Sequence, residues 1–345
     1  MKNKTIKIVY LASGKNRYLD LWKKGEAPSN SLYGFNFLMN DPEIDFCFLN
    51  IREYYQGNFF LKIYKKIKLI KNLEKYDIVI LHQYLDLLFL RFFFKSKNKW
   101  VIFNINLVTL LSKSNKVKLF IWKKIIKSAD FIINLSNFQE RFLISNNLKI
   151  SKMKVVKFGV DNDFYQKNNL HQGYILSVGL DAGRDFKTLV EAISLINKKV
   201  IIISPQRNLK NIKNFPKNLV IIDSVDKIRL RSYYSNAQII VVPSKASKKI
   251  GSDCSGQTVL LEALASGKPV VTNLKEWIID YNLKDKLIIY QTENPKDLRE
   301  KINSLINNKD LYENLSYEGR QIIENKLNSK RMMTNMKKQL LNLIK

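Results

Sequence analysis

The residues best suited to chemistry lie in one stretch, Ser252 to Thr272, which reads SDCSGQTVLLEALASGKPVVT. It contains a polar loop ending at Gly256, an apolar run typical of a buried helix, the stop Ser266-Gly267 and the strand PVVT. The first N–H groups of a helix have no partner inside it, and a small residue lets an anion approach them closely. The loop is therefore predicted to bind a diphosphate through Ser255, Gly256, Gln257 and Thr258.

Polar residues recur at four-residue spacing along the expected helix. Thr258, Glu262 and Ser266 share one face, while apolar residues cover the others. Such a stripe either meets solvent or lines a cleft. In a cleft, Glu262 could accept hydrogen bonds from a ribose diol, as carboxylates beside nucleotides commonly do.

A cation is expected to face the same loop. Gly179 to Arg184 lies between a buried strand and a helix, which places it at the carboxyl end of that strand. Ligands gather at this edge in open parallel sheets, so Arg184 is predicted to face the diphosphate. The alternative is that Arg184 merely pairs with Asp181 or Asp185.

Strands and helices alternate along the chain, and this order predicts an α/β fold with parallel strands and right-handed crossovers. Expected strands in the first half lie at 6–12, 46–49, 77–83, 100–106, 131–135 and 154–158. Those in the second half lie at 174–179, 199–204, 219–223, 238–244, 269–272 and 286–290.

The length of 345 residues suits two domains that each bury a core. Mixed polar residues at 161–172 follow Gly159 and indicate an interdomain hinge. We therefore expect a first domain at 1–160, a second domain at 173–328 and a C-terminal helix at 329–345.

The net charge is +29, from 59 Lys and Arg against 30 Asp and Glu, and the excess is concentrated in the first half. Part of it follows from the joint abundance of Lys, Asn and Ile, a bias of AT-rich genomes. Two basic amphipathic stretches, 59–76 and 116–130, could contact an anionic membrane or form solvated helix faces. In the first stretch the apolar residues are Phe60, Ile63, Ile67, Ile70 and Leu73, and lysines occupy the opposite side.

Cysteine content and the N-terminus indicate a cytoplasmic protein. Two cysteines, Cys47 and Cys254, exclude a disulfide framework, and the start MKNKTIKIVYLAS runs directly into a strand without a signal peptide. The longest apolar run, LDLLFLRFFF at 85–94, is shorter than the roughly twenty residues of a membrane span. Any membrane contact is therefore expected to be peripheral, on the inner face.

Two further candidates follow strands of the first domain. Gly14 lies in the loop after the first strand, a usual position for a ligand. His82 ends the strand at 77–83 and is one of two histidines in the chain. A structural role is the alternative for His82.

The stretch at 252–272 resembles the nucleotide-sugar signature of retaining glycosyltransferases of family 4, within glycosyl transferases group 1. The resemblance continues in SADFIINLS, KFGVDNDF, ILSVGLDAGRDFKTLVEA and SNAQIIVVPS, which stand in the family's order. It covers most of the chain and is strongest in the second half. It implies a GT-B fold, with two Rossmann-like domains facing a cleft and a C-terminal helix that crosses back to the first domain. The first domain would bind the acceptor and the second the nucleotide sugar.

The resemblance also assigns roles at the expected donor site. Arg184 takes the position of the family's Lys, whereas the family's Arg corresponds to Leu180. Lys245 and Arg207 follow strands and could replace the missing cation. In the family these cations stabilise negative charge on the departing nucleoside diphosphate.

Two carboxylates eight positions apart are usual in the family, and here the pair is Cys254 and Glu262. The retained Glu262 implies ribose binding, and Asp253 could replace the lost carboxylate near the sugar. A Cys254 nucleophile would need an activating base, so a packing or contact role is favoured.

His82 matches a histidine that family members commonly have after this strand. A second family histidine, which contacts the sugar, is replaced by the asparagines Asn104 and Asn106. The expected catalytic residues are therefore Arg184, Glu262 and His82, and the donor-binding residues are Ser255, Gly256, Gln257, Thr258, Asp253, Gly179 and Gly14.

The expected function is transfer of a hexose, with retention, from a UDP- or GDP-sugar to a lipid-linked or growing glycan in cell-surface polysaccharide biosynthesis. No cofactor is expected beyond the donor. Metal independence is expected because no Cys, His or Asp cluster has metal-ligand spacing. The absence of a GKS or GKT phosphate loop argues against an ATPase.

Three alternatives stay open. Leu180 and Cys254 motivate a degenerate, non-catalytic subunit that binds a nucleotide sugar or supports an active partner. A nucleotide-sugar 2-epimerase of the same fold is the second. Nucleic-acid binding rests on charge alone and lacks interleaved aromatic and glycine motifs, so it ranks last.

Overall fold

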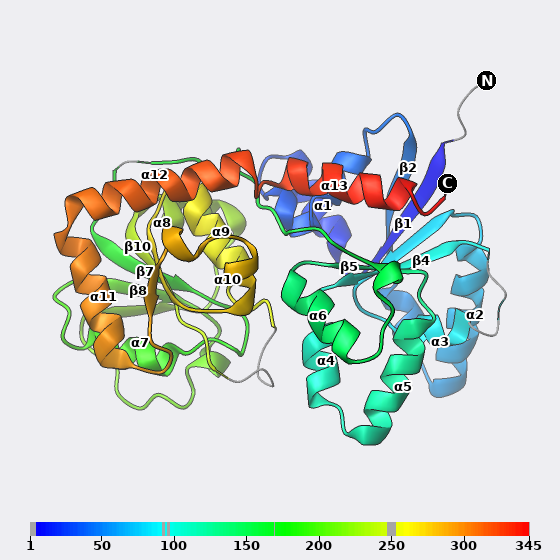
Figure 1. Ribbon diagram of the computed structural model, residues 1–345, viewed down its shortest axis with the longest axis horizontal. Helices are drawn as coiled ribbons and strands as arrows, with labels where there is room; N and C mark the ends of the chain where they lie inside the picture. Colours follow the sequence, from blue (N-terminus) through cyan, green and yellow to red (C-terminus); the bar gives the residue numbers. More distant parts are fainter. Residues whose placement is uncertain (1–4, 92–93, 95–96, 169, 247–252, 345) are drawn as a thin grey trace. The chain divides into compact units, whose positions relative to one another are not determined.

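The computed structural model describes residues 5–91, 94, 97–168, 170–246 and 253–344. Ser252 of the expected phosphate-binding stretch, Asn169 of the expected hinge and residues 92–93 of the apolar run lie outside the described residues. The chain divides into two compact units (Figure 1). The first comprises Met1–Lys24, Ser31–Phe158 and Lys330–Lys345, and the second comprises Gly25–Asn30 and Gly159–Ser329.

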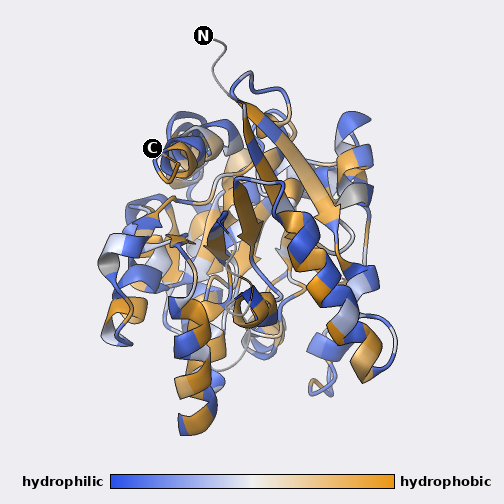
Figure 2. Ribbon diagram, turned by 90° about the vertical axis from the view of Figure 1, so that its right-hand side faces the viewer, coloured by the Kyte–Doolittle hydropathy of each residue, from blue (hydrophilic) through white to orange (hydrophobic). Residues whose placement is uncertain are grey.

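The first unit is built on a six-stranded parallel sheet with the order β2-β1-β3-β4-β5-β6. All residues of β3 and β5 are buried, as expected for strands covered on both faces. In Figure 2 much of the strand area of the first unit has the orange colour of hydrophobic residues. The strands are β1 Ile6–Ala12, β2 Ile44–Asn50, β3 Ile78–Leu81, β4 Lys99–Asn104, β5 Phe131–Asn134 and β6 Met153–Val155.

The helices of the first unit begin near the carboxyl ends of the strands and return toward the amino ends. Asparagine side chains cap two of them, because Asn58 accepts a hydrogen bond from Leu61 N and Asn115 accepts one from Lys118 N. The helices are α1 Lys15–Lys23, α2 Phe59–Leu73, α3 Asp86–Arg91, α4 Leu107–Lys113, α5 Lys116–Lys127, α6 Asn137–Ser145 and α13 Ser329–Leu341. Short 3₁₀ turns lie at Ser29–Leu32, Phe35–Leu38, Arg52–Tyr55 and Ile150–Lys152.

The apolar face of α2 is buried only toward its C-terminal end. Leu69, Ile70 and Leu73 are buried, but Phe60 is 81% exposed. Only the C-terminal half of α2 packs into the core formed with the strands, because the helix continues beyond that core.

The second unit holds another six-stranded parallel sheet, with the order β12-β11-β10-β7-β8-β9. Its strands are β7 Tyr174–Val178, β8 Val200–Ile203, β9 Leu219–Ile222, β10 Ala237–Val242, β11 Val270–Asn273 and β12 Ile288–Tyr290. Its helices are α7 Phe186–Ile193, α8 Lys227–Asn236, α9 Gln257–Ala265, α10 Glu276–Asp280, α11 Pro295–Asn307 and α12 Lys309–Asn325. Short 3₁₀ turns lie at Gln206–Asn208 and Lys284–Lys286.

In both sheets the chain adds strands first toward one edge and then toward the other, starting from an inner strand. The chain order reverses between β1 and β3 in the first sheet and between β7 and β10 in the second. Ligands of open α/β sheets bind outside the carboxyl ends of the strands at such switch points. The predicted α/β fold with two Rossmann-like units is therefore confirmed, and each unit has one expected ligand position.

The unit boundaries differ from the predicted domain limits. The chain passes between units at Phe158 and Gly159, so the predicted hinge at 161–172 lies inside the second unit. The segment Gly25–Asn30, assigned to the first domain from sequence, also belongs to the second unit. The reason is a set of long-range hydrogen bonds, including Ser29 N to Asp161 Oδ2 at 2.8 Å, which local patterns do not reveal.

The C-terminal helix α13 belongs to the first unit from Lys330 onward. Its buried residues are Met332, Met333, Met336 and Leu340. Lys337 pairs with Asp41 at 2.7 Å and Glu43 at 2.6 Å. No helix in the described part of the chain combines the length and apolarity needed to span a membrane.

Candidate functional site

The candidate site of the second unit lies at the switch point between β7 and β10. The loop after β7 returns beside the end of β10, where Lys245 N donates to Gly183 O at 2.9 Å and Asp185 N donates to Pro243 O at 3.2 Å. Arg184 thus forms an antiparallel bridge with Ser244. Backbone pairing therefore fixes Arg184 at the carboxyl edge of the sheet, as predicted from sequence.

Arg184 is a buried cation with unused donors. Its side chain is 3% exposed, and Nε and Nη1 have no hydrogen-bond partner. Burial lowers the pKa of the guanidinium to about 10, so it stays protonated at neutral pH. A buried charge without a hydrogen-bond partner is costly, and an anionic ligand would supply one.

The N-terminal end of α9 adjoins this guanidinium. Gly256 caps the helix with φ +92°, and no side chain caps its first amides. A Cβ at Gly256 would lie 2.8 Å from Arg184 Nη1 and 2.9 Å from Val242 Cγ1. Glycine is therefore required here both by the backbone conformation and by the close approach of Arg184.

Two neighbours of Gly256 add further unpaired polar groups. Ser255 Oγ and Gln257 Nε2 are buried and have no hydrogen-bond partner, whereas the Thr258 side chain is exposed. Buried polar groups are rarely left unpaired in native proteins. The amide end of α9, these side chains and Arg184 together make an arrangement suited to a phosphate group.

Gly179 supports Arg184 from the opposite side. A Cβ at this position would lie within 2.4 Å of Arg184 Nε and 2.5 Å of its Cγ. The glycine thus leaves room for the arginine side chain, which gives it a packing role in the described structure.

Glu262 lies on the same helix in an internal network. Its Oε1 accepts hydrogen bonds from Asn30 Nδ2 at 3.0 Å and Tyr165 Oη at 2.9 Å, and its Oε2 accepts one from Tyr234 Oη at 3.1 Å. Glu262 and Ser266 are almost fully buried, so a solvent-facing stripe is excluded for these two residues. Asn30, Tyr165 and Tyr234 were not predicted from the sequence, since they come from distant segments.

Tyr234 electrostatically links the two charged groups of the site. Its pKa is raised by burial and by the negative charge of Glu262, and the positive charge of Arg184 acts in the opposite direction. Burial and Glu262 also raise the pKa of Tyr165. Both phenols therefore remain protonated and act as donors to the carboxylate.

Two further cations reach the loop that carries Arg184. Lys245 Nζ donates to Ala182 O at 3.0 Å, and Arg207 Nη2 donates to Leu180 O at 3.4 Å. Both were candidates from sequence to replace the cation missing at Leu180. The structure brings them to the loop between β7 and α7, a position that sequence spacing did not supply.

Cys254 does not have the environment of a nucleophile. Its Sγ lies 3.5 Å from Asp253 Oδ2, and burial together with that carboxylate raises the pKa of the thiol. A protonated thiol is a poor nucleophile. The packing or contact role predicted from sequence is consistent with this geometry.

The first unit holds the other two predicted site residues. Gly14 follows β1 with φ +75°, and His82 follows β3, so both lie at the switch point of the first sheet. His82 Nδ1 is 2.6 Å from the Tyr10 hydroxyl, and the two rings stack. Asn104 has a structural role, since its Nδ2 donates to Asn134 and its Oδ1 accepts from Leu107 N.

A cavity of about 310 Å³ opens at this edge of the first sheet. Its wall combines polar residues after the strands with apolar residues of α4 and α5. The lining residues are His82, Gln83, Tyr84, Leu85, Asp86, Asn106, Leu107, Leu110 and Trp122.

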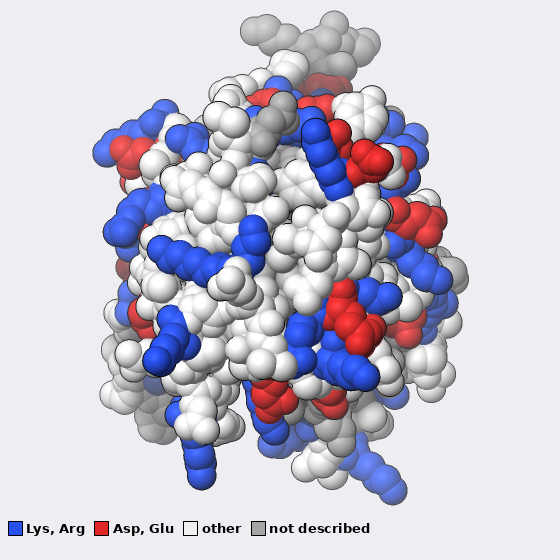
Figure 3. All heavy atoms as spheres, turned by 90° about the vertical axis from the view of Figure 1, so that its left-hand side faces the viewer, with Lys and Arg blue, Asp and Glu red and all other residues white. Residues whose placement is uncertain are grey.

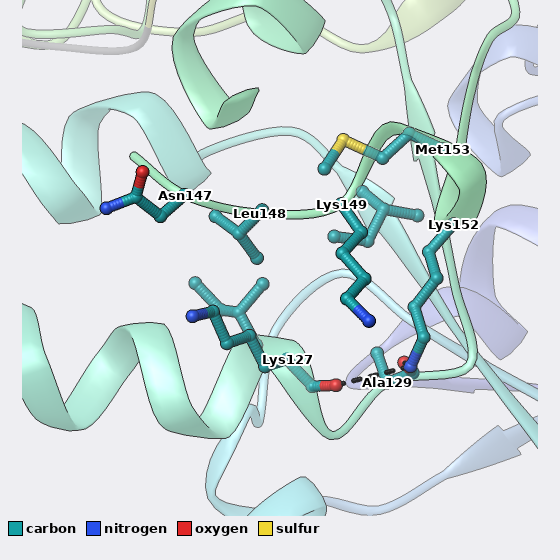
Figure 4. A pocket seen from close by; sticks show the side chains of 9 residues that line it. Lys127, Ala129, Asn147, Leu148, Lys149, Lys152 and Met153 are labelled. Carbon is teal, nitrogen blue, oxygen red and sulfur yellow. Dashed lines mark hydrogen bonds between the residues drawn. The ribbon is translucent and has the colours of Figure 1, made fainter. Parts of the chain in front are cut away.

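A second cavity of about 220 Å³ lies near the amino ends of β5 and β6 (Figure 4). Lys127, Lys149 and Lys152 surround an apolar floor that includes Met153. Lys152 Nζ donates to Ala129 O at 3.0 Å and Lys127 O at 3.4 Å, so it closes the C-terminal end of α5. This contact gives Lys152 a structural function, away from the switch point.

The described residues contain no group of three or more His, Cys, Asp or Glu side chains arranged to hold a metal ion. The positive charge at the switch point between β7 and β10 comes from Arg184, Arg207 and Lys245.

Residues 165–322, which cover most of the second unit, match the family described as glycosyl transferases group 1. The second unit is thus similar in sequence to the group 1 glycosyltransferases. A curated relative, an uncharacterized glycosyltransferase of Methanocaldococcus jannaschii, is 29% identical over 225 residues. The match covers 61% of this chain and spans 59% of the length of that relative.

Two solved structures share this fold over nearly the whole length of both chains. Sucrose-phosphate synthase from Thermosynechococcus elongatus matches with a TM-score of 0.77 and 15% identity, over 98% of this chain and 99% of that chain. HepE of Anabaena in complex with UDP and glucose matches with a TM-score of 0.72 and 13% identity, over 98% and 100% of the two chains. At these identities the likeness establishes the fold alone.

Proposed function

We propose that this protein transfers a sugar from a UDP- or GDP-sugar to an acceptor, with the donor diphosphate bound at the N-terminal end of α9. The observation that carries the proposal is the buried, protonated guanidinium of Arg184, whose Nε and Nη1 have no partner beside Gly256. The match of the second unit to the group 1 glycosyltransferase family supports a sugar donor. Structures of HepE hold UDP or UDP-glucose in the same fold.

Arg184 has the charge needed for departure of the nucleoside diphosphate. Negative charge grows on the leaving phosphate as the bond to the anomeric carbon breaks, and a buried cation acts strongly on it. Arg207 and Lys245, whose side chains contact carbonyl groups of the same loop, would add positive charge there. The three cations could meet the charge of the diphosphate without a metal ion, which is the basis for proposing metal-independent transfer. Retention is proposed from the resemblance of the sequence to the retaining glycosyltransferases of family 4.

Glu262 would act on the ribose of the donor. Three donors already fix its carboxylate, and Oε2, which accepts one of these hydrogen bonds, can accept a further one. The network would thereby hold the carboxylate in one orientation. Ser255, Gln257, Thr258 and Asp253 are the further donor-binding residues that we propose, with Gly179 and Gly14 supporting the loops.

The acceptor is proposed to bind the first unit, in the cavity lined by His82 and Trp122. His82 is the proposed catalytic residue on this side, with its ring oriented by Tyr10. A lipid-linked or growing glycan in cell-surface polysaccharide biosynthesis is the proposed acceptor, and a hexose is the proposed sugar.

Thermal unfolding in the presence of a panel of UDP- and GDP-sugars tests the donor site. A ligand that binds the native state raises the melting temperature in proportion to its affinity and concentration. We expect one donor to stabilise the wild type and to lose this effect in Arg184→Met. The same variant should melt at a higher temperature than the wild type without ligand, because it removes a buried cation whose Nε and Nη1 have no hydrogen-bond partner.

The matched control is Arg229→Met, which removes an exposed arginine of the same unit and should leave the ligand response unchanged. An undiminished response in Arg184→Met would refute the proposed site. Donor consumption with a glycan acceptor then separates the alternatives. A non-catalytic subunit would bind without consuming donor, as Leu180 and Cys254 suggest, and a 2-epimerase would act without acceptor.

A further inference from the structure

Two helices of the first unit leave large apolar side chains in solvent at their N-terminal ends. In α2, Phe59 is 70% exposed, Phe60 81% and Tyr64 63%. In α5, Val117 is 68% exposed, Phe120 59% and Ile121 48%. We call these six residues the helix-tip surface. Folded proteins rarely leave such side chains in a contiguous exposed group unless another surface covers them.

The two helix tips lie at the same edge of the sheet. In parallel α/β units each helix runs antiparallel to the strands, so the helix N-termini gather at the carboxyl edge. The short helix α3 contacts both α2 and α5, so the three helices lie on the same side of the sheet with α3 between the other two. Figure 1 shows the connection from α4 to α5 projecting from the first unit, with the start of α5 at its end.

The exposed residues follow helical spacing and continue into lysines. Phe60, Tyr64 and Lys68 recur every four residues along α2. In α5, Val117, Phe120, Ile121 and Lys124 share one face in the same way. Each helix therefore presents apolar side chains in its first turns and positive charge in the next turns.

The charge around the helix-tip surface has one sign. No acidic residue occurs from 57 to 73 or from 115 to 129. Lys68, Lys116, Lys118 and Lys124 are exposed in these segments. Aromatic and aliphatic side chains flanked by lysines match a bilayer whose headgroups carry negative charge and whose interior is apolar.

The second unit lacks this combination on the face drawn in Figure 3. There, Lys and Arg side chains are spread over the surface with Asp and Glu among them. Its exposed apolar residues come from separate segments, for example Leu170, Leu195 and Tyr317. The helix-tip surface is therefore not simply a consequence of the chain's overall basic composition.

We propose that the helix-tip surface docks the protein on an anionic lipid bilayer, with the side chains of the six residues inserted at the level of the headgroups and the neighbouring lysines on the lipid phosphates. The docking does not depend on the donor site. If the proposed function also holds, the cavity at His82 and Trp122 would open beside the bilayer, because α5 contributes to both. An acceptor carried by a lipid would then meet the enzyme at that surface.

Vesicle flotation with the full chain tests the docking. The lipids are phosphatidylcholine alone, and phosphatidylcholine with about one third phosphatidylglycerol, at about 0.1 M and about 0.5 M salt. We expect the wild type to bind the anionic vesicles and to bind the neutral ones at least about tenfold more weakly. The variant Phe60→Ser/Phe120→Ser should bind the anionic vesicles at least about tenfold more weakly than the wild type.

Lys118→Glu/Lys124→Glu should weaken binding at the lower salt and less so at the higher salt. The matched control is Leu195→Ser, an equally exposed apolar residue of the second unit, which should bind like the wild type. Melting temperatures of all variants are compared to exclude misfolding.

Three results would overturn the proposal. The first is equal binding of wild type and Phe60→Ser/Phe120→Ser, and the second is no binding of the wild type to anionic vesicles. The third is a dimeric wild type in light scattering that becomes monomeric in the double variant, since the helix-tip surface would then join two copies of the chain.

Discussion

The guanidinium of Arg184 and the carboxylate of Glu262 are both buried in the second unit, but they differ in the number of hydrogen-bond partners that the protein supplies. Three donors satisfy the carboxylate, whereas Nε and Nη1 of the arginine have no partner. Breaking a buried network usually destabilises a protein, while removing an unpaired charge stabilises it. The two residues should therefore respond in opposite directions to substitution.

Glu262→Gln tests the network. The amide replaces one accepting oxygen by an NH₂ group, which cannot accept a hydrogen bond from Asn30, Tyr165 or Tyr234. We expect the free energy of unfolding to fall by about 1–3 kcal/mol in urea titrations. Glu191→Gln, on the exposed side of α7, should change it by less than about 0.5 kcal/mol. Equal stability of the two variants would contradict the network.

At the scale of elements, α9 has both ends defined by glycine. Gly256 begins the helix, and Gly267 ends it with φ +67°. Gly267 N donates to Leu264 O and Lys268 N donates to Ala263 O, each at 3.0 Å, which is a Schellman motif. The helix stop predicted at Ser266-Gly267 is confirmed, and the motif brings the Lys268 side chain into the interior.

Lys268, at this end of the helix, is expected to make the free energy of unfolding depend on pH. Its Nζ donates to Asn168 O at 2.7 Å and to Leu170 O at 3.2 Å, while burial and Lys167 lower its pKa from 10.5 to about 8. Between these values the unfolded chain binds the proton and the native state does not, so stability rises with pH. Below the native pKa the buried charge is a constant penalty.

We therefore expect the wild type to gain stability over Lys268→Met as pH rises from about 7.5 to about 10, on the order of 2 kcal/mol in the free energy of unfolding. Urea titrations at several pH values give this difference. Lys217→Met, at an exposed lysine of the same unit, should show no such trend. A difference that stays constant across the window would mean that Lys268 titrates normally.

At the scale of the whole molecule, each unit is built from segments that are not consecutive in the chain. The connections at Gly159 and Ser329 lie side by side, since Val160 N donates to Leu327 O at 3.0 Å and Ser329 N donates to Val160 O at 2.9 Å. A Cβ at Gly159 would lie 2.2 Å from Asn328 O, so only glycine permits this approach. The last helix thereby returns to the unit in which the chain began.

Met336 tests the contribution of α13 to the first unit. The residue is fully buried, and truncating a buried methionine costs about 2–5 kcal/mol. We expect Met336→Ala to lower the free energy of unfolding of the first unit by this amount in urea titrations. Asn335→Ala, at the exposed neighbouring position, should have little effect. A small loss in Met336→Ala would show that α13 contributes little to that core.

The sequence by itself determined the strands, the limits of α9 and the position of Arg184 at a strand end. These features depend on residues within a few positions of one another, such as continuous runs of Ile and Val or a glycine after an apolar helix. The alternation of these elements also determined the parallel α/β fold.

Only the tertiary structure decided how these residues are paired and which are buried. Glu262 accepts hydrogen bonds from Asn30, which is 232 positions away in the chain, and from Tyr165, which is 97 positions away. No local sequence pattern encodes such contacts. The same holds for Phe60, which has the spacing of a buried residue in α2 but lies beyond the core that the strands form. Burial depends on what packs over a residue, and packing is set by segments distant in the chain.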